Sequence, residues 1–142
     1  METREIKFRG KRTTTGEWVY GYLTEIFTYA GHIQRYAIDT CQQYDADGIS
    51  IDIFEIISKT RGQYTGLHDK NGVEIYEGDI VSMADPVLGG RVTVEMVYAA
   101  PSFMVKFVPS LNSPIISISD LWTFSDGEVI GNKFENPELV EM

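Results

Sequence analysis

Cysteine and histidine are scarce in this sequence, and their scarcity excludes several kinds of site. Cys41 is the one cysteine, so no disulfide can form within the chain and no zinc site can be built from several thiolates. His32 and His68 lie far apart in the sequence, which leaves no pair of histidines at metal-ligand spacing. A lone thiol fits a reducing compartment, and we expect a cytoplasmic protein.

Long apolar runs and catalytic signatures are also missing. No stretch approaches the roughly 20 apolar residues of a membrane-spanning helix, and the opening METREIKFRGKR lacks a signal-peptide core, so we expect neither export nor membrane insertion. No nucleophile elbow, Walker loop or dinucleotide-binding glycine motif occurs. We therefore predict that the protein is not an enzyme and has no cofactor, no metal and no catalytic residue.

A partial calcium-loop pattern occurs at residues 43–48. Asp45, Asp47 and Gly48 have the spacing of such a loop, but its first position is Gln43 and its twelfth is Phe54, where a bidentate glutamate is needed. We interpret the two aspartates as turn residues, with weak cation binding as the alternative.

Positive charge is concentrated at the start of the chain, where five of the 12 Lys and Arg lie within residues 1–12. The sequence holds 12 Lys and Arg against 21 Asp and Glu, a net charge of −9. Such a surface repels phosphate backbones, which argues against general nucleic-acid binding. Basic residues 4–12 are the exception. Their alternation predicts a half-buried strand with Ile6 and Phe8 on one face and Lys7 and Arg9 on the other, where the charges offset acids on neighbouring strands.

What the sequence does have is a period of two in apolar residues that suit strands, which indicates a mainly β fold. In residues 1–60 we predict an N-terminal antiparallel sheet. In residues 61–142 we predict a small, five-stranded, partly open barrel of the Src-homology-3-like kind, ending in a tail, with both regions packed as one compact unit. The predicted strands are residues 4–8, 17–26, 32–39, 49–57, 79–83, 91–98, 102–107, 115–119 and 128–131, with a compact turn at 121–124.

One segment has a competing interpretation. Asp52 and Glu55 have the spacing of a helix capping box, which would favour a short helix. Four isoleucines among the eight residues 49–56 favour the strand instead, because β-branched side chains lose rotamer freedom in a helix.

Aromatic residues provide a functional signal. Trp18, Tyr20 and Tyr22 alternate along one predicted strand and share a face, opposite Val19 and Leu23. Such a row most often packs into the core. If it is exposed, it forms a surface for self-association or for a partner protein, because large rigid aromatic rings dominate interface energetics.

The most informative segment is residues 63–81, QYTGLHDKNGVEIYEGDIV. Gly66, Gly72 and Gly78 are predicted to set turns, and Asp69 to bond its own backbone in the turn that ends at Gly72. Asp79 is expected either to cap a turn or to face solvent. The predicted core residues are Ile75, Ile80 and Val81, and the polar residues available for binding are His68, Lys70, Glu74 and Glu77.

Three blocks together resemble one known family. REIKFR at residues 4–9, the block at 63–81, and VIGNKFENPEL at 129–139 are similar, in order and spacing, to the YopX family of phage and prophage proteins. The resemblance implies a mainly β protein of phage origin with a barrel in its second half. It implies no established activity, so no catalytic residue is transferred.

These observations favour an accessory phage or prophage protein that works by binding. The expected partner is a host or phage protein, or a second copy in a homo-oligomer, through Trp18, Tyr20 and Tyr22 or the polar residues of 63–81. One alternative is a nucleic-acid-associated protein that uses residues 4–12. Another is an acidic mimic that occupies a host nucleic-acid-binding protein.

Overall fold

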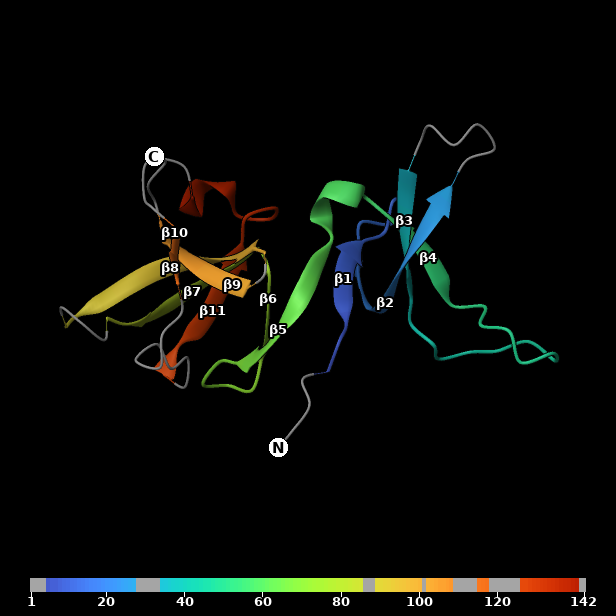
Figure 1. Cartoon of the computed structure of the whole chain (residues 1–142), viewed down its shortest axis with the longest axis horizontal. Helices are drawn as coiled ribbons and strands as arrows, with labels where there is room; N and C mark the ends of the chain where they lie inside the picture. The colour runs from blue at the N-terminus through green and yellow to red at the C-terminus, as the bar shows by residue number, and fades with distance from the viewer. Residues whose placement is uncertain are drawn as a thin grey trace. The chain divides into compact units, whose positions relative to one another are not determined.

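Strands form almost all of the regular structure (Figure 1). The structure is a computed structural model and describes residues 5–27, 34–85, 89–100, 102–108, 115–117 and 126–140. No α-helix occurs among these residues, which confirms the prediction of a mainly β protein. The elements are β1 (Phe8–Lys11), β2 (Trp18–Phe27), β3 (Gln34–Asp39), β4 (Ile53–Ile56), η1 (Ser58–Thr60), β5 (Gly62–His68), β6 (Glu74–Tyr76), β7 (Asp79–Ala84), β8 (Arg91–Ala99), β9 (Ser102–Phe107), β10 (Ile115–Ser117), β11 (Glu128–Asn132) and η3 (Pro137–Leu139).

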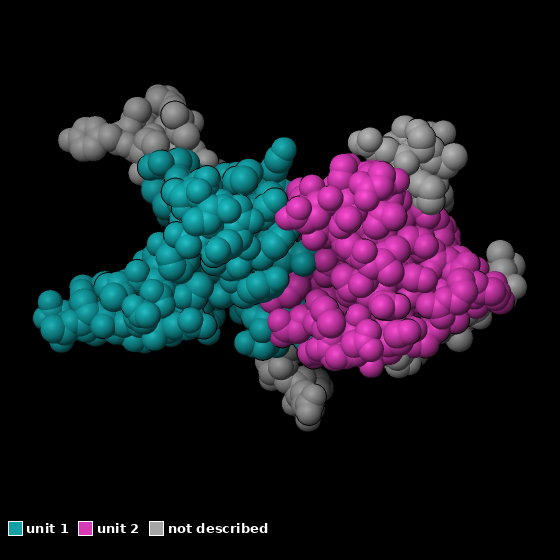
Figure 2. Space-filling model, turned by 180° about the vertical axis from the view of Figure 1, so that it is seen from behind, with its two compact units in different colours: residues 1–64 teal, residues 65–142 magenta. Residues whose placement is uncertain are grey.

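The strands form two antiparallel sheets. One has the order β4-β3-β2-β1-β5-β6 and the other β10-β9-β8-β7-β11. The chain divides into two compact units, residues 1–64 and residues 65–142 (Figure 2), where the sequence placed a boundary between residues 60 and 61. Of residues 52–55, which have the competing helical pattern, residues 53–55 lie in β4 and Asp52 directly precedes it, so the strand is observed and not the helix.

The predicted barrel in the second half is not observed. The predicted strands are found, although residues 118–119 of the strand expected at 115–119 lie outside the described residues, but they form an open sheet. Closure requires the two outermost strands to pair with each other. Here β10 pairs with β9 and β11 pairs with β7, at opposite edges, so neither sheet closes within the described part of the chain. The predicted turn at 121–124 lies outside the described residues.

Unit 1 is built on the long hairpin of β2 and β3, with β4 beside β3. The start of the chain differs from the prediction, because the first strand is residues 8–11 and its faces are inverted. Arg9 is only 6% exposed, whereas Ile6 is 61% exposed. Arg9 packs against the Trp18 ring, 4.7 Å from its centre, while Gly10 on the opposite face leaves the space that Ile56 of β4 fills. Backbone hydrogen bonds from Thr13 N to Glu55 O (3.1 Å) and from Ile57 N to Lys11 O (2.8 Å) fix this approach.

Unit 2 holds the larger apolar core. Its fully buried members come from β6, β7, β8 and β9, and strands of this kind bury one face against their neighbours. Ile75, Ile80 and Val81 are all 0% exposed, as predicted. The cluster consists of Ile75, Val81, Met83, Val94, Met96 and Val105, with Val92, Phe103, Phe107 and Val129 packed against it.

The turns of the 63–81 block follow the predicted chemistry in most respects. Gly72 (φ 79°) and Gly78 (φ 93°) adopt the left-handed backbone that closes turns, while Gly66 (φ 87°) lies inside β5 rather than in a turn. Asp79 is 2% exposed, and its Oδ2 accepts a hydrogen bond from Tyr76 N at 2.7 Å. It therefore caps the turn and does not face solvent.

Asp69 has a larger role than a local turn. Its carboxylate is 6% exposed, and Oδ1 accepts hydrogen bonds from Asn71 N (2.8 Å) and Val73 N (2.9 Å). Oδ2 accepts a third from Val129 N (3.0 Å) in β11, sixty residues away along the chain. One carboxylate thus joins the β5–β6 turn to the last strand of the sheet.

Candidate functional site

Two of the three predicted surface aromatics point into solvent. Tyr20 is 46% exposed and Tyr22 is 63% exposed, so neither ring is a core residue. Trp18 is half-buried, with the Arg9 guanidinium 4.7 Å from the centre of its ring. Of the two interpretations of the aromatic row, core or exposed surface, the exposed one therefore holds for Tyr20 and Tyr22. Their use in binding stays a prediction.

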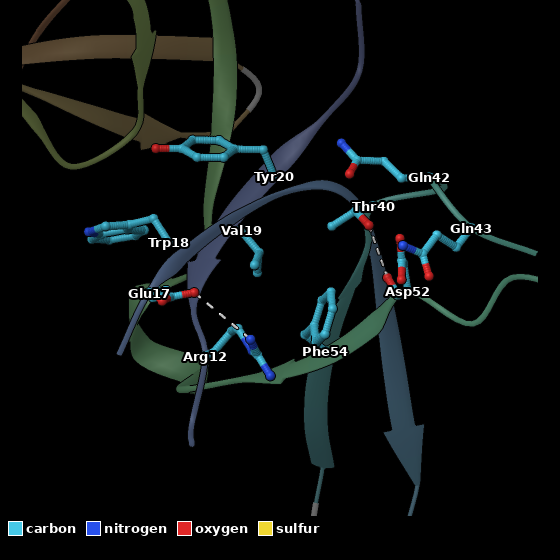
Figure 3. Close-up of a pocket in the computed structure, with 10 residues that line it drawn as sticks. All are labelled: Arg12, Glu17, Trp18, Val19, Tyr20, Thr40, Gln42, Gln43, Asp52 and Phe54. Carbon is cyan, nitrogen blue, oxygen red and sulfur yellow. Dashed lines mark hydrogen bonds and ion pairs between the residues drawn. The ribbon is translucent and has the colours of Figure 1, made fainter. Parts of the chain in front are cut away.

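A pocket of about 430 Å³ opens beside these rings. Figure 3 shows Trp18 and Tyr20 on one side and Gln42 and Gln43 on the other, with Phe54 near the middle. The side chains come from the start of β2, from the segment after β3 and from β4. Aromatic walls with amide groups opposite them suit a polar chain that also carries apolar side chains.

A second pocket, of about 300 Å³, continues from the first. The two have Tyr20, Thr40 and Gln42 in common, so they adjoin, and we name the two together the aromatic groove. Its lining residues all belong to unit 1: Glu5, Ile6, Lys7, Arg12, Glu17, Trp18, Val19, Tyr20, Gly21, Tyr22, Thr40, Gln42, Gln43, Asp52 and Phe54.

The charges of the groove are engaged with one another and with rings. Arg12 Nη1 lies 3.9 Å from Glu17 Oε2, and the Arg12 guanidinium lies 4.2 Å from the centre of the Phe54 ring. Lys7 Nζ lies 3.7 Å from Glu5 Oε2. The cations of the basic segment thus lie beside acids and aromatic faces, so their charge is partly offset at the rim of the groove.

An arm, residues 41–52, begins at the edge of the groove, and Asp39 fixes its base. Asp39 Oδ1 accepts hydrogen bonds from Ser50 Oγ (2.6 Å) and Cys41 N (2.9 Å). The Ser50 hydroxyl, helped by the Cys41 N–H and opposed by desolvation, holds the pKa of Asp39 below its usual range. Cys41 itself has a left-handed backbone (φ 55°), which is unusual for a residue other than glycine. The base of the arm is therefore a rigid, specific structure.

The Cys41 thiol is not poised for nucleophilic chemistry. Desolvation, followed by the hydrogen bond to Asp39, raises the pKa of the thiol above its ordinary value. Because the thiolate is the nucleophile, this environment keeps the reactive form scarce at neutral pH.

The polar residues predicted from the 63–81 block lie in unit 2, apart in sequence and unit from the aromatic groove. His68 and Lys70 are exposed, and Lys70 Nζ lies 3.6 Å from Glu128 Oε2. Glu74 is half-buried and accepts a hydrogen bond from the Tyr76 hydroxyl at 3.1 Å. Glu77 is also half-buried. These side chains line neither pocket of the groove.

Neither a metal-ligand cluster nor a membrane-spanning helix is found in the described part of the chain. No group of three or more His, Cys, Asp or Glu there is arranged to hold a metal ion. No helix among the same residues is long and apolar enough to cross a membrane.

Several groove residues had no signal in the sequence. Thr40, Gln42, Gln43 and Phe54 come from segments outside the aromatic row, and only the pairing of β3 with β2 and β4 brings them to it. The available hint was the Ile49-x-Ile51-x-Ile53 alternation around an Asp-Gly turn. It predicts a hairpin but does not say which face is buried.

Comparison with known proteins is consistent with this fold. A crystal structure of protein EF1440 from Enterococcus faecalis is similar with a TM-score of 0.55 and 27% sequence identity, over 98% of this chain and 100% of that chain. Comparison with curated proteins gives no match. A family model described as YopX protein matches residues 7–141. The chain therefore belongs to the YopX family.

Proposed function

We propose that this protein is a non-catalytic binding module that receives an extended segment of a protein partner in the aromatic groove. The observation that carries the proposal is the exposure of Tyr20 and Tyr22 (46% and 63%) along a groove lined by further aromatic and amide side chains. Exposed tyrosines beside a concave surface are typical of interface anchors, because they bury large area at low entropic cost. The proposed setting is the cytoplasm of a bacterial host, where the protein acts as a phage or prophage accessory factor.

The charges support a protein partner over a nucleic acid. The described cations of the basic segment lie against rings or acids: Arg9 over Trp18, Lys7 beside Glu5, and Arg12 beside Glu17. A phosphate backbone would have to replace these contacts before any counterion release could drive its binding. An extended peptide can instead lay its apolar side chains against the exposed rings and use the amides of Gln42 and Gln43.

Loss of both tyrosine rings tests the proposal. The double variant Tyr20→Ser/Tyr22→Ser removes two exposed rings and leaves the core intact, so it should fold normally and bind a partner at least about tenfold more weakly. The measurement is quantitative affinity capture from the bacterial host, followed by titration of each recovered protein.

Tyr98→Ser is the matched control. Tyr98 is 45% exposed and lies on β8 in unit 2, so this variant loses a comparable exposed ring away from the groove. Partners should be retained by the control and lost by the double variant. Equal recovery with both variants would refute the groove as the binding site.

A further inference from the structure

The arm of residues 41–52 is an acidic hairpin whose isoleucines are exposed in the described part of the chain. Asp45 closes its turn by accepting hydrogen bonds from Asp47 N and Ile49 N, both at 2.9 Å. Ile49 and Ile51 are 62% and 56% exposed, and Ile53, where β4 begins, is 47% exposed. Residues two apart on an extended segment share a face, so these three form one isoleucine stripe. Figure 1 shows the segment between β3 and β4 running away from the strands, and Figure 2 shows unit 1 with a narrow projection.

Charge distinguishes the arm from the rest of its unit. The arm holds three acids, Asp45, Asp47 and Asp52, and no Lys or Arg, a net charge of −3. The other described residues of unit 1 (5–27, 34–40 and 53–64) hold seven Lys and Arg against five Asp and Glu, a net charge of +2. An acidic arm and a basic body attract each other across two copies of the same chain, within a protein whose net charge of −9 otherwise opposes self-association.

We propose that the aromatic groove of one copy is filled by the arm of a second copy, and that two copies exchange arms about a two-fold axis. This inference rests on the proposed function and names the partner. The isoleucine stripe packs against the exposed rings of Tyr20 and Tyr22, and the acidic arm lies near Lys7 and Arg12 at the rim.

The placement of the two surfaces fits such a dimer. The base of the arm also lines the groove, through Gln42, Gln43 and Asp52. Each copy therefore presents its arm and its groove side by side. A two-fold axis beside this base satisfies both contacts at once, as an isologous interface requires. The isoleucine stripe does not line the groove of its own copy, so it is available to the other.

Sedimentation velocity of the full chain over a range of concentrations tests the exchange. The wild-type protein should be dimeric, and Ile49→Ser/Ile51→Ser should raise the dimer dissociation constant at least about tenfold. Val73→Ser/Ile130→Ser is the matched control, because these side chains are 48% and 41% exposed in unit 2, and it should dimerise as the wild type does. A monomeric wild type, or an arm variant that dimerises normally, overturns the inference. Unchanged far-UV circular dichroism and unfolding midpoints establish that the variants are folded.

Mixing two variants tests which surface binds which. The arm variant keeps its groove, and Tyr20→Ser/Tyr22→Ser keeps its arm, so each alone should be monomeric while an equimolar mixture forms mixed dimers through one intact contact. Absence of mixed dimers would refute arm-in-groove packing. If the wild type is monomeric but still captures a host protein through Tyr20 and Tyr22, the arm exchange is wrong and the proposed function stands. If Tyr20→Ser/Tyr22→Ser changes neither dimerisation nor capture, both fail.

Discussion

Replacing Asp69 with asparagine should destabilise the protein by removing one acceptor from a buried carboxylate. Asparagine keeps one oxygen for Asn71 N and Val73 N, but its amide nitrogen then faces Val129 N, donor against donor. Leaving that buried N–H unsatisfied costs about 1–3 kcal/mol, and loss of the negative charge weakens the remaining two bonds. We expect a loss of about 2–4 kcal/mol in the free energy of unfolding, a large share of the roughly 5–15 kcal/mol typical of a whole protein.

Urea unfolding at neutral pH measures this loss. The midpoint for Asp69→Asn should fall while the slope stays that of the wild type, because the surface exposed on unfolding is unchanged. Asp47→Asn is the control, since Asp47 is an exposed aspartate in a turn and its substitution should stay within about 0.5 kcal/mol of wild type. If the free energy of unfolding of Asp69→Asn is also within about 0.5 kcal/mol of the wild type, the hydrogen bond between Asp69 and β11 does not stabilise the protein as proposed.

The carboxylate of Asp69 should also affect how the free energy of unfolding changes with pH in the acid range. Burial would raise the pKa of Asp69, but the N–H groups of Val129, Val73 and Asn71, with Lys70 nearby, outweigh it and hold the pKa below its ordinary value. A group whose pKa is lowered on folding contributes stability above its unfolded pKa, about 3.9, and loses that contribution as the pH falls towards the folded pKa. As the pH falls below about 4, the free energy of unfolding of Asp69→Asn should therefore decrease less steeply than that of the wild type.

Three further changes have expected outcomes from the same urea measurement. Gly10→Ala places a Cβ against Ile56 and should cost about 1–3 kcal/mol, and a neutral result would contradict the close contact of β1 with β4. Cys41→Gly removes left-handed strain and should gain up to about 1 kcal/mol, whereas a loss would mean that the thiol packs favourably. Burial raises the pKa of Glu95 despite nearby Lys133, so stability should fall as the pH rises above the ordinary value of about 4.3. Glu95→Gln should remove that slope and be more stable than wild type at pH 7.

The sequence predicted strands well because the alternation is strong where one face is buried. The strand expected at 17–26 is β2, and the isoleucines of the 63–81 block lie in the core as expected. The hairpin at Asp69 and Gly72 followed from turn chemistry alone, since few other residues close such a turn.

Neither the closure of the second sheet nor the face that each strand buries could be predicted, because both depend on residues far away in the sequence. Arg9 is buried against Trp18 of the neighbouring strand β2, and the alternation around Arg9 does not encode that contact. The aromatic row was ambiguous for the same reason. Alternation places Trp18, Tyr20 and Tyr22 on one face, but the strands beside β2 decide which face meets solvent.

The order of the second sheet has a consequence for synthesis on the ribosome. β7 begins at residue 79, yet its outer neighbour β11 is made only at residues 128–132. Until then β7 presents an apolar edge with unpaired backbone groups, the kind of edge that recruits other chains. The pairing that covers this edge, from Glu128 opposite Ser82 to Asn132 opposite Asp79, can form only after residues 128–132 have been made. The nascent chain is thus at greatest risk of aggregation just before its final strand emerges.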